Sequence, residues 1–226
     1  MSFQTIIDNA TYITIDRQKV TSFTVSRSGR VKTAERGQGI YRFSVGSPQG
    51  LKYSTNRNLL EDLDNASRTT METIDIGSTN TNMSYITEYQ GDLSQPQLDQ
   101  IVTKGSDLTI GEANIYLNTT NVTGSPGGTL FKKGDYIQPQ GSSGTYPYPY
   151  TVTEDIAWSS SASLRVPVHR GLLPFTADTP VGVNATPNFG KDVTFQVKAL
   201  TSPTYSVVPH NLIEFAGDFE FVEIIE

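Results

Sequence analysis

The stretch Gly128–Gly171, GTLFKKGDYIQPQGSSGTYPYPYTVTEDIAWSSSASLRVPVHRG, decides the fold class. It contains short apolar runs separated by Lys-Gly-Asp, Gly/Ser/Pro and Ser-rich segments, which is typical of consecutive strands joined by turns. In its last run, Leu164, Val166 and Val168 alternate with polar residues, so one face is expected in a core and the other in solvent. Pro167 cannot donate a ladder hydrogen bond, which predicts an edge or bulged strand.

The same alternation recurs along the chain. Tyr41, Phe43 and Val45 share one face of their segment and are expected in a core. Strands are expected at residues 3–7, 12–15, 23–26, 40–45, 71–76, 83–89, 107–110, 113–117, 129–131, 136–138, 150–153, 163–169, 193–200, 205–208 and 219–226. The last of these should enter a sheet with its acidic residues facing outward. This content predicts a mainly β fold, a β-barrel or a β-sandwich.

One α-helix is expected near residues 55–67, packed across a sheet. A Ser-Thr pair can cap its start, and Leu59 and Leu63 lie on one face at helical spacing. The acidic residues that lie away from this face are Glu61, Asp62 and Asp64. A solvated helix face explains them better than an acidic catalytic cluster. A second, shorter helix is expected at about residues 95–102, because Ser and Gln there have capping-box spacing.

The chain of 226 residues is long enough for one large β domain or two small ones. Two β-rich halves meet near residue 104. We therefore expect an N-terminal β module with the helix at residues 1–104 and a C-terminal β module at residues 105–226. One continuous domain is the alternative.

Composition restricts the classes of function. The chain has no cysteine, which excludes disulfides, thiol nucleophiles and cysteine-based zinc sites. No apolar run approaches the length of a membrane span, and the N-terminus does not resemble a secretory signal. The net charge is −6, whereas sequence-independent DNA binding requires clustered cations. The basic segment Arg27–Arg36 and the pair Lys132-Lys133 are explained better by solvated strands or loops.

No compact catalytic or cofactor motif is present. The two histidines, His169 and His210, are far apart in the sequence and have no partner at metal-ligand spacing. Nucleophile-elbow, P-loop, dinucleotide-binding and EF-hand patterns are also missing. A pair of carboxylates flanking a sugar stays open, but nothing favours it. We expect a protein that is not an enzyme, with no cofactor and no metal.

Candidate contact residues fall into aromatic and basic groups. Aromatic side chains alternate with prolines near the only tryptophan, and they suit a protein interface, a sugar-binding platform or a stiff turn that covers the core. The aromatic candidates are Tyr146, Tyr148, Tyr150 and Trp158. The basic candidates are Arg27, Arg30, Lys32 and Arg36, in the polar segment 26–39 that is expected to form a hairpin or arm. Residues 172–190 are expected to form a second extended connection or arm.

Several segments, taken in order, resemble a module of tailed-bacteriophage tail proteins. They are Gly134–Gln138 (GDYIQ), Tyr148–Asp155 (YPYTVTED) and Ser161–Arg170 (SASLRVPVHR), and residues 41–76 and 217–226 fit the same pattern. The likeness is to small tail proteins of cyanobacterial phages with contractile tails, of the distal-tail or tube-initiator kind.

The resemblance implies a structural role in the virion, at the baseplate or at the end of the tail tube. The subunit would be made in the host cytoplasm and would assemble by β-strand and arm contacts into a ring, for which six copies are expected. Its partners would be other copies and other tail or baseplate proteins, with DNA passing nearby in the lumen. The alternatives are a distal-tail-like adaptor that carries a receptor-binding protein and, from another class, a carbohydrate-binding β-sandwich.

Overall fold

The chain folds mainly into antiparallel β-sheets, as its alternating pattern predicts. A computed structural model describes residues 2–18, 21–25, 27–28, 30–35, 39–65, 71–77, 83–124 and 126–225. Strands account for 34% of the residues and helices for 15%, which confirms the expected mainly β class. The described strands form open sheets in a sandwich-like arrangement, and no closed barrel occurs among them.

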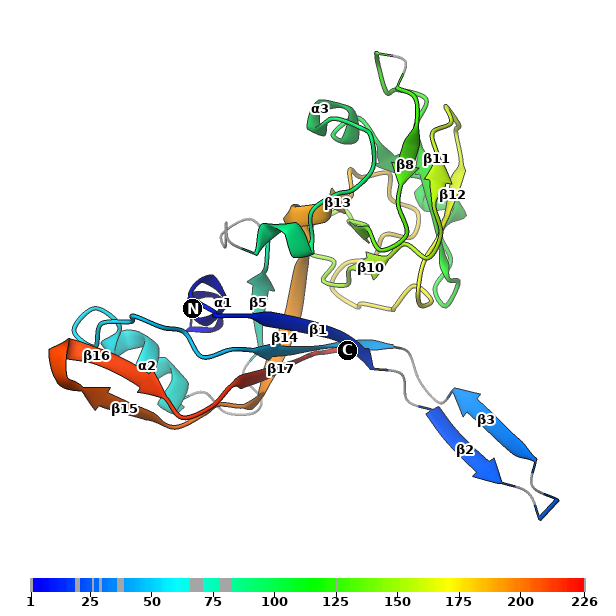
Figure 1. Cartoon of the computed structure of the whole chain (residues 1–226). Helices are drawn as coiled ribbons and strands as arrows, with labels where there is room; N and C mark the ends of the chain where they lie inside the picture. Colours follow the sequence, from blue (N-terminus) through cyan, green and yellow to red (C-terminus); the bar gives the residue numbers. More distant parts are fainter. Residues whose placement is uncertain are drawn as a thin grey trace.

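The largest sheet has five strands in the order β1-β4-β17-β14-β5. They are β1 (Ile13–Gln18), β4 (Ile40–Val45), β17 (Phe219–Glu223), β14 (Thr194–Thr201) and β5 (Met71–Asp75). Each neighbouring pair is antiparallel, and Phe221 lies opposite Phe43 at the centre of the sheet. The C-terminal strand therefore enters a sheet as expected, between two strands that are distant in sequence (Figure 1).

The remaining elements are short. The helices are α1 (Ser2–Asp8), α2 (Arg57–Asn65) and α3 (Gln95–Leu98), with 3-10 turns η1 (Ser84–Ile86), η2 (Gly105–Asp107), η3 (Gly190–Asp192) and η4 (Pro209–Asn211). The other strands are β2 (Thr21–Val25), β3 (Val31–Glu35), β6 (Val102–Thr103), β7 (Asn114–Asn118), β8 (Thr129–Phe131), β9 (Tyr136–Gln138), β10 (Tyr150–Thr151), β11 (Ile156–Ala157), β12 (Leu164–Pro167), β13 (Asn188–Phe189), β15 (Tyr205–Val208) and β16 (Leu212–Phe215). No described helix combines the length and the apolar character needed to cross a membrane.

The five-stranded sheet and two helices enclose one hydrophobic core. Inward residues of β4, β14 and β17 alternate along each strand, and α1 and α2 add their apolar faces. The fully buried residues include Phe3, Ile6, Tyr41, Phe43, Val45, Ile74, Val193, Phe195, Val197, Phe219 and Phe221. The predicted helix at residues 55–67 is confirmed as α2. We call the described residues before 87 and after 190 the sheet module.

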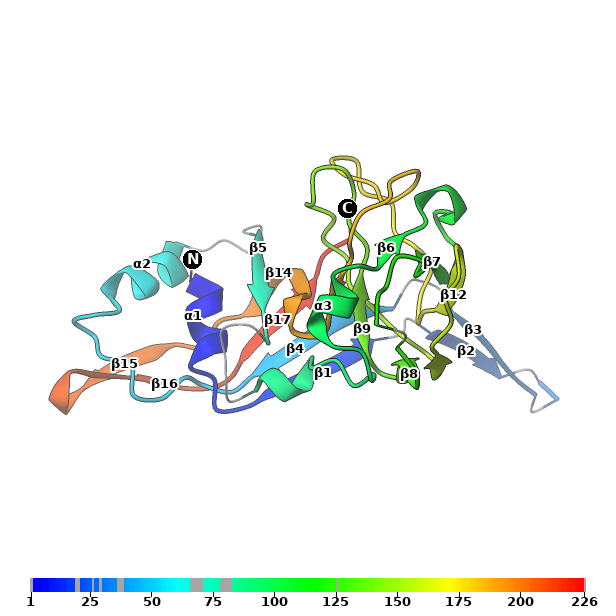
Figure 2. The same cartoon turned by 90° about the horizontal axis from the view of Figure 1, so that it is seen from above.

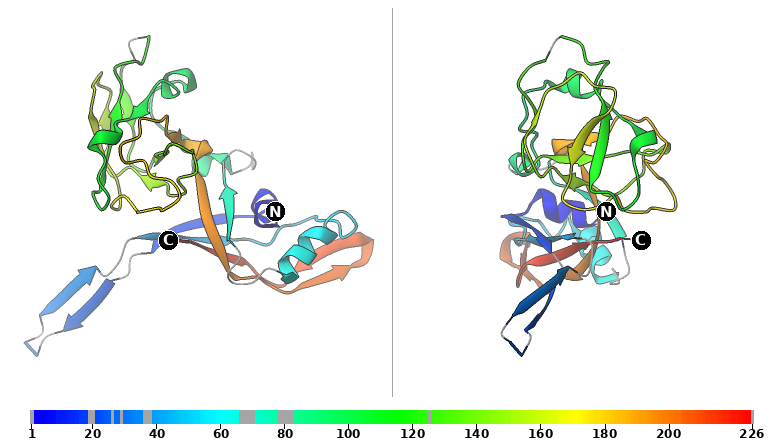
Figure 3. Two further views of the ribbon diagram at one scale, coloured as in Figure 1. Left: turned by 180° about the vertical axis from the view of Figure 1, so that it is seen from behind. Right: turned by 90° about the vertical axis from the view of Figure 1, so that its right-hand side faces the viewer.

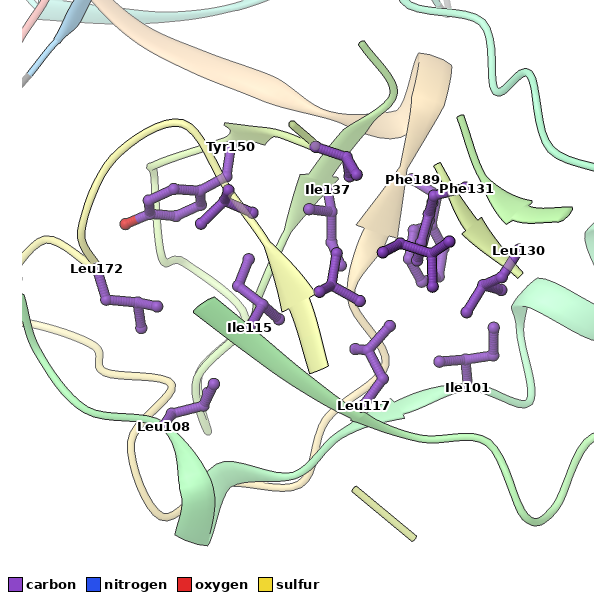
Figure 4. Close-up of a cluster of buried hydrophobic side chains, with 14 of the residues drawn as sticks. Ile101, Leu108, Ile115, Leu117, Leu130, Phe131, Ile137, Tyr150, Leu172 and Phe189 are labelled. Atoms are coloured by element: carbon purple, nitrogen blue, oxygen red, sulfur yellow. The ribbon is translucent and has the colours of Figure 1, made fainter. Parts of the chain in front are cut away.

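A second core lies within residues 87–190, which we call the inserted module. Its three small sheets have the orders β10-β9-β13, β11-β8 and β12-β7-β6. Their inward side chains, with those of the connecting loops, converge on the cluster in Figure 4. The labelled members are Ile101, Leu108, Ile115, Leu117, Leu130, Phe131, Ile137, Tyr150, Leu172 and Phe189. Val166 and Val168 are buried and β12 is an edge strand, as its alternation and Pro167 predict.

The two cores follow a nested course along the chain. Leaving the sheet module after η1, the chain builds the inserted module and returns through β13 into β14. The expected modules at residues 1–104 and 105–226 are a different division, because β14 and β17 pair with β5 and β4 across that boundary. Figure 1 shows the inserted module above the sheet, connected through β5 and β14.

Several local predictions need correction. Residues 3–7 form helix α1, because Phe3, Ile6 and Ile7 have the helical spacing that buries all three. The strand expected at residues 83–89 is instead the turn η1 and an irregular segment. The strand expected at 107–110 is reduced to a single bridge at Ile110. Glu223 faces inward with Phe219 and Phe221 rather than outward.

The segment 172–190, expected to be an extended arm, packs on its own module. Leu172, Leu173 and Phe189 are buried in its core. The backbone N–H of Thr103 donates to the carbonyl of Ala185 at 2.8 Å. The burial and the backbone hydrogen bonds hold this segment against the module, so it is not free to reach a neighbour.

Candidate assembly site

A hairpin made of β2 and β3 projects from one end of the sheet module. Its two strands pair with each other from Thr21 opposite Glu35 to Val25 opposite Val31. Figures 1 and 3 show the hairpin extending away from both modules, as a continuation of the β1–β4 ribbon. This hairpin, which we call the arm, supports the predicted arm at residues 26–39, although residues 26, 29 and 36–38 lie outside the described residues.

The β1 edge of the large sheet is open. The N–H of Gly46 donates to the carbonyl of Tyr12 at 2.9 Å. Because hydrogen-bonded and non-bonded pairs alternate in an antiparallel ladder, the backbone groups of Ile13, Ile15 and Arg17 point away from β4. No described strand pairs with this side of β1. Its N–H and C=O groups are therefore available to a strand of another chain.

The opposite edge of the same sheet is covered. On β5, the N–H of Asp75 donates to the side-chain oxygen of Gln4 at 2.8 Å, and the Gln4 amide donates back to the Asp75 carbonyl at 2.8 Å. The N–H of Phe3 donates to the Glu72 carboxylate at 3.1 Å. Helix α1 thus takes the place of a neighbouring strand along β5. The sheet protects one edge and leaves the other, beside the arm, accessible.

A groove lies at the foot of the arm, between the two modules. It consists of two cavities of about 270 Å³ and about 510 Å³ that share Arg17 and Thr153. The lining residues are Arg17, Gly39, Lys133, Gly134, Thr151, Val152, Thr153 and His169. We call this the junction groove. Arg17 and Lys133 are both exposed, and none of the described lining residues carries a carboxylate.

Behind the junction groove, a buried ion pair joins the two modules. The Arg170 guanidinium donates to both carboxylate oxygens of Glu223, at 2.5 and 2.6 Å. It also donates to the carbonyls of Gly39 and Pro149, at 2.8 and 3.0 Å. Both charged side chains are almost completely buried. These four hydrogen bonds hold the pair in position.

Tyrosine rings enclose the guanidinium. Its central carbon lies 5.3 Å from the ring centre of Tyr41 and 5.2 Å from that of Tyr150, within range of cation–π attraction. Burial raises the pKa of Tyr150 to about 12 against the opposing effect of Arg170. Burial also raises the pKa of Glu223, opposed by its bonds from Arg170. The modules are therefore fixed to each other by a dry polar contact.

The junction contains a further hydrogen bond between the modules and another within the inserted module. The hydroxyls of Tyr41 and Thr151 lie 2.6 Å apart. The N–H of Thr151 donates to Nδ1 of His169 at 3.0 Å, which places the hydrogen of the neutral imidazole on Nε2. His169 thus orients the backbone of Thr151.

The tyrosines proposed as a contact platform are core residues. Tyr146, Tyr148 and Tyr150 are at most 1% exposed. The Tyr146 hydroxyl donates to the Leu173 carbonyl at 2.8 Å, and it lies 2.7 Å from the Tyr150 hydroxyl. No turn is formed at residues 145–149, and the side chains at positions 146, 148 and 150 all lie in the core, which corrects the surface prediction. Trp158 is partly buried against the same core.

The basic candidates fall on the arm. Arg27 and Arg30 are exposed near its tip. Lys32 lies in β3, opposite Thr24, and Arg36 lies outside the described residues. The arm brings Arg27 and Arg30 to one protrusion, but it does not bring them near the aromatic candidates.

Sequence reasoning missed the residues that build the junction. Arg170 and Glu223 are 53 positions apart, and no local pattern relates them. A signal existed for Glu223, because it continues the inward alternation of Phe219 and Phe221. Arg17 and Lys133 come from different modules, so only the fold brings them together.

Comparisons of this chain with protein-family models and with curated proteins find no match.

Proposed function

We propose that this protein is a non-enzymatic structural subunit that assembles with copies of itself, in the manner of a phage tail or baseplate ring. The arm is the observation that carries the proposal. An isolated two-stranded hairpin is marginally stable in water, and the apolar side chain of Val25 at the end of β2 is exposed rather than packed on a core. A hairpin kept in this position is best explained by a partner that it contacts.

The open β1 edge supports the same proposal. The sheet covers β5 with α1 but leaves β1 exposed beside the arm. Proteins usually protect exposed edges, because these pair readily with other chains. One protected edge and one open edge give each copy two different ends, which suits a head-to-tail contact that closes into a ring.

The virion location, a ring of six and neighbouring tail proteins follow from the sequence resemblance and belong to the proposal. An adaptor that carries a receptor-binding protein would use the same ring contacts together with a further partner. The burial of Tyr146, Tyr148 and Tyr150 removes the platform on which the carbohydrate-binding alternative depended.

Replacing residues 20–37 with a short Asn/Gly turn that joins β1 to β4 tests the proposal. We expect the intact chain to form a defined oligomer in sedimentation velocity, and the armless variant to sediment as a monomer. Thermal unfolding should remain cooperative, because both described cores are intact. Oligomerisation that is unchanged in the armless variant would contradict a role for the arm.

A further inference from the structure

The two ends of the sheet module differ in charge. At the end with the arm, the exposed cations are Arg17, Arg27 and Arg30 of the sheet module and Lys133 of the adjoining inserted module, and they outnumber the exposed Asp16 beside Arg17. At the opposite end, α2 lies beside the β15–β16 hairpin (Figures 1 and 2). The exposed acidic residues of α2 are Glu61, Asp62 and Asp64. The chain carries a net charge of −6, so a groove lined by the cations Arg17 and Lys133 contrasts with the overall charge of the protein.

We infer that the junction groove binds the acidic outer face of α2 from a second copy. This inference rests on the proposed self-assembly and names the two surfaces that meet. The groove supplies the Arg17 guanidinium and the Lys133 ammonium around open volumes of about 270 and about 510 Å³. Carboxylates are the side chains that complement these cations.

The position of Arg17 connects the groove to the open sheet edge. Arg17 lies on β1, and its backbone N–H and C=O point away from β4. A copy that approaches this edge therefore meets the groove at the same time. The buried faces of Leu59 and Leu60 hold α2 against its own module, so its acidic residues are presented on a fixed helix.

Charges next to the groove limit which ligand fits. Asp155 accepts the backbone N–H of Lys133 at 2.8 Å, and Glu154 is exposed beside it. These carboxylates oppose a densely charged anion but leave room for separate side-chain carboxylates. On α2, Arg57 lies over the Tyr53 ring at 5.0 Å, and Asp64 accepts from the Tyr205 hydroxyl at 3.2 Å. Glu61 and Asp62 are both exposed on α2, and we expect them to contact the groove.

Charge reversal on each surface tests the pairing. Variant one carries Arg17→Glu and Lys133→Glu, and variant two carries Glu61→Lys and Asp62→Lys. Each variant alone places like charges at every contact, and we expect its half-assembly concentration to rise at least about tenfold. A control with Arg165→Glu and Lys191→Glu reverses two exposed cations elsewhere. We expect it to assemble like the unmodified chain.

A chain that carries all four reversals restores opposite charges at each contact, and it should assemble again. Circular dichroism and thermal unfolding of every variant confirm that it folds. Assembly of variant one at the unmodified concentration, or failure of the fourfold variant to recover, would overturn the groove–helix pairing while leaving self-assembly in place. An unmodified chain that stays monomeric would overturn both proposals.

Discussion

The guanidinium of Arg170 and the carboxylate of Glu223 form a two-pronged ion pair between the inserted module and the central strand of the sheet. The contact is buried, and backbone carbonyls from both sides accept further hydrogen bonds from the two terminal nitrogens of the same guanidinium. Because the chain enters and leaves the inserted module close to this sheet, one rigid contact is enough to fix the module above it. A fixed module keeps the two sides of the junction groove together.

Removing one partner of this pair should destabilise the protein strongly. We expect Arg170→Met or Glu223→Met alone to lower the free energy of unfolding by about 3–5 kcal/mol, because each leaves a buried charge without its partner. The double variant should lose clearly less than the sum of the two single losses. Urea unfolding of the four proteins measures this cycle. Additive losses would show that the pair is not coupled.

Alkaline pH should unfold the protein steeply. Burial raises the pKa values of Tyr41, Tyr146 and Tyr150 above the ordinary value of 10.0. The folded state then retains its tyrosine protons where the unfolded state releases them, so these tyrosines leave the stability unchanged below about pH 10 and lower it above that pH. Each such tyrosine contributes a loss of about 1.4 kcal/mol per pH unit.

Tyrosinate absorbance and urea unfolding across this pH range measure the effect. Together the three side chains should remove about 4 kcal/mol per pH unit between about pH 10 and 12. Tyr150→Phe should reduce the slope of stability against pH. Gradual, independent ionisation of every tyrosine near pH 10 in the folded protein would contradict their burial.

Gly105 is expected to tolerate no side chain. A Cβ there would lie 2.2 Å from the backbone nitrogen of Val183 and 2.3 Å from its carbonyl oxygen. Gly105→Ala should therefore displace the segment around Val183 and cost about 1–3 kcal/mol. Gly127→Ala is the matched control, because no atom lies within 4 Å of its added Cβ. Equal melting temperatures for the two variants would contradict the close packing of residues 172–190.

Local patterns predicted the elements that alternate clearly, and they failed where tertiary contacts decide. The sequence correctly predicted that the core contains Tyr41, Phe43 and Val45. Alternate residues of a strand lie on opposite faces, and polar residues on one face of this strand place the other face in the core. The run Phe3–Ile7 is too short to distinguish strand from helix by its apolar residues alone. A segment in which tyrosines alternate with prolines, such as residues 146–150, occurs both at interfaces and in cores. Only the fold decides between the two.

The candidate site was accessible to sequence reasoning only in part. The polar segment containing Arg27 and Arg30 was predicted as an arm from its composition. The junction groove was not, since Arg17 and Lys133 meet only because the inserted module folds back over β1. The nested order of the modules also has no local signal, because strands on either side of residues 87–190 join one sheet.

The most direct test is the mass of the intact purified chain, measured by light scattering over a range of concentrations and followed by electron microscopy of the largest species. We expect a single closed ring whose mass is a whole multiple of the 24.7 kDa subunit. Elevated salt should weaken it, since charged surfaces form part of the contact. A chain that remains monomeric at every concentration would contradict self-assembly through the arm and the open edge of β1.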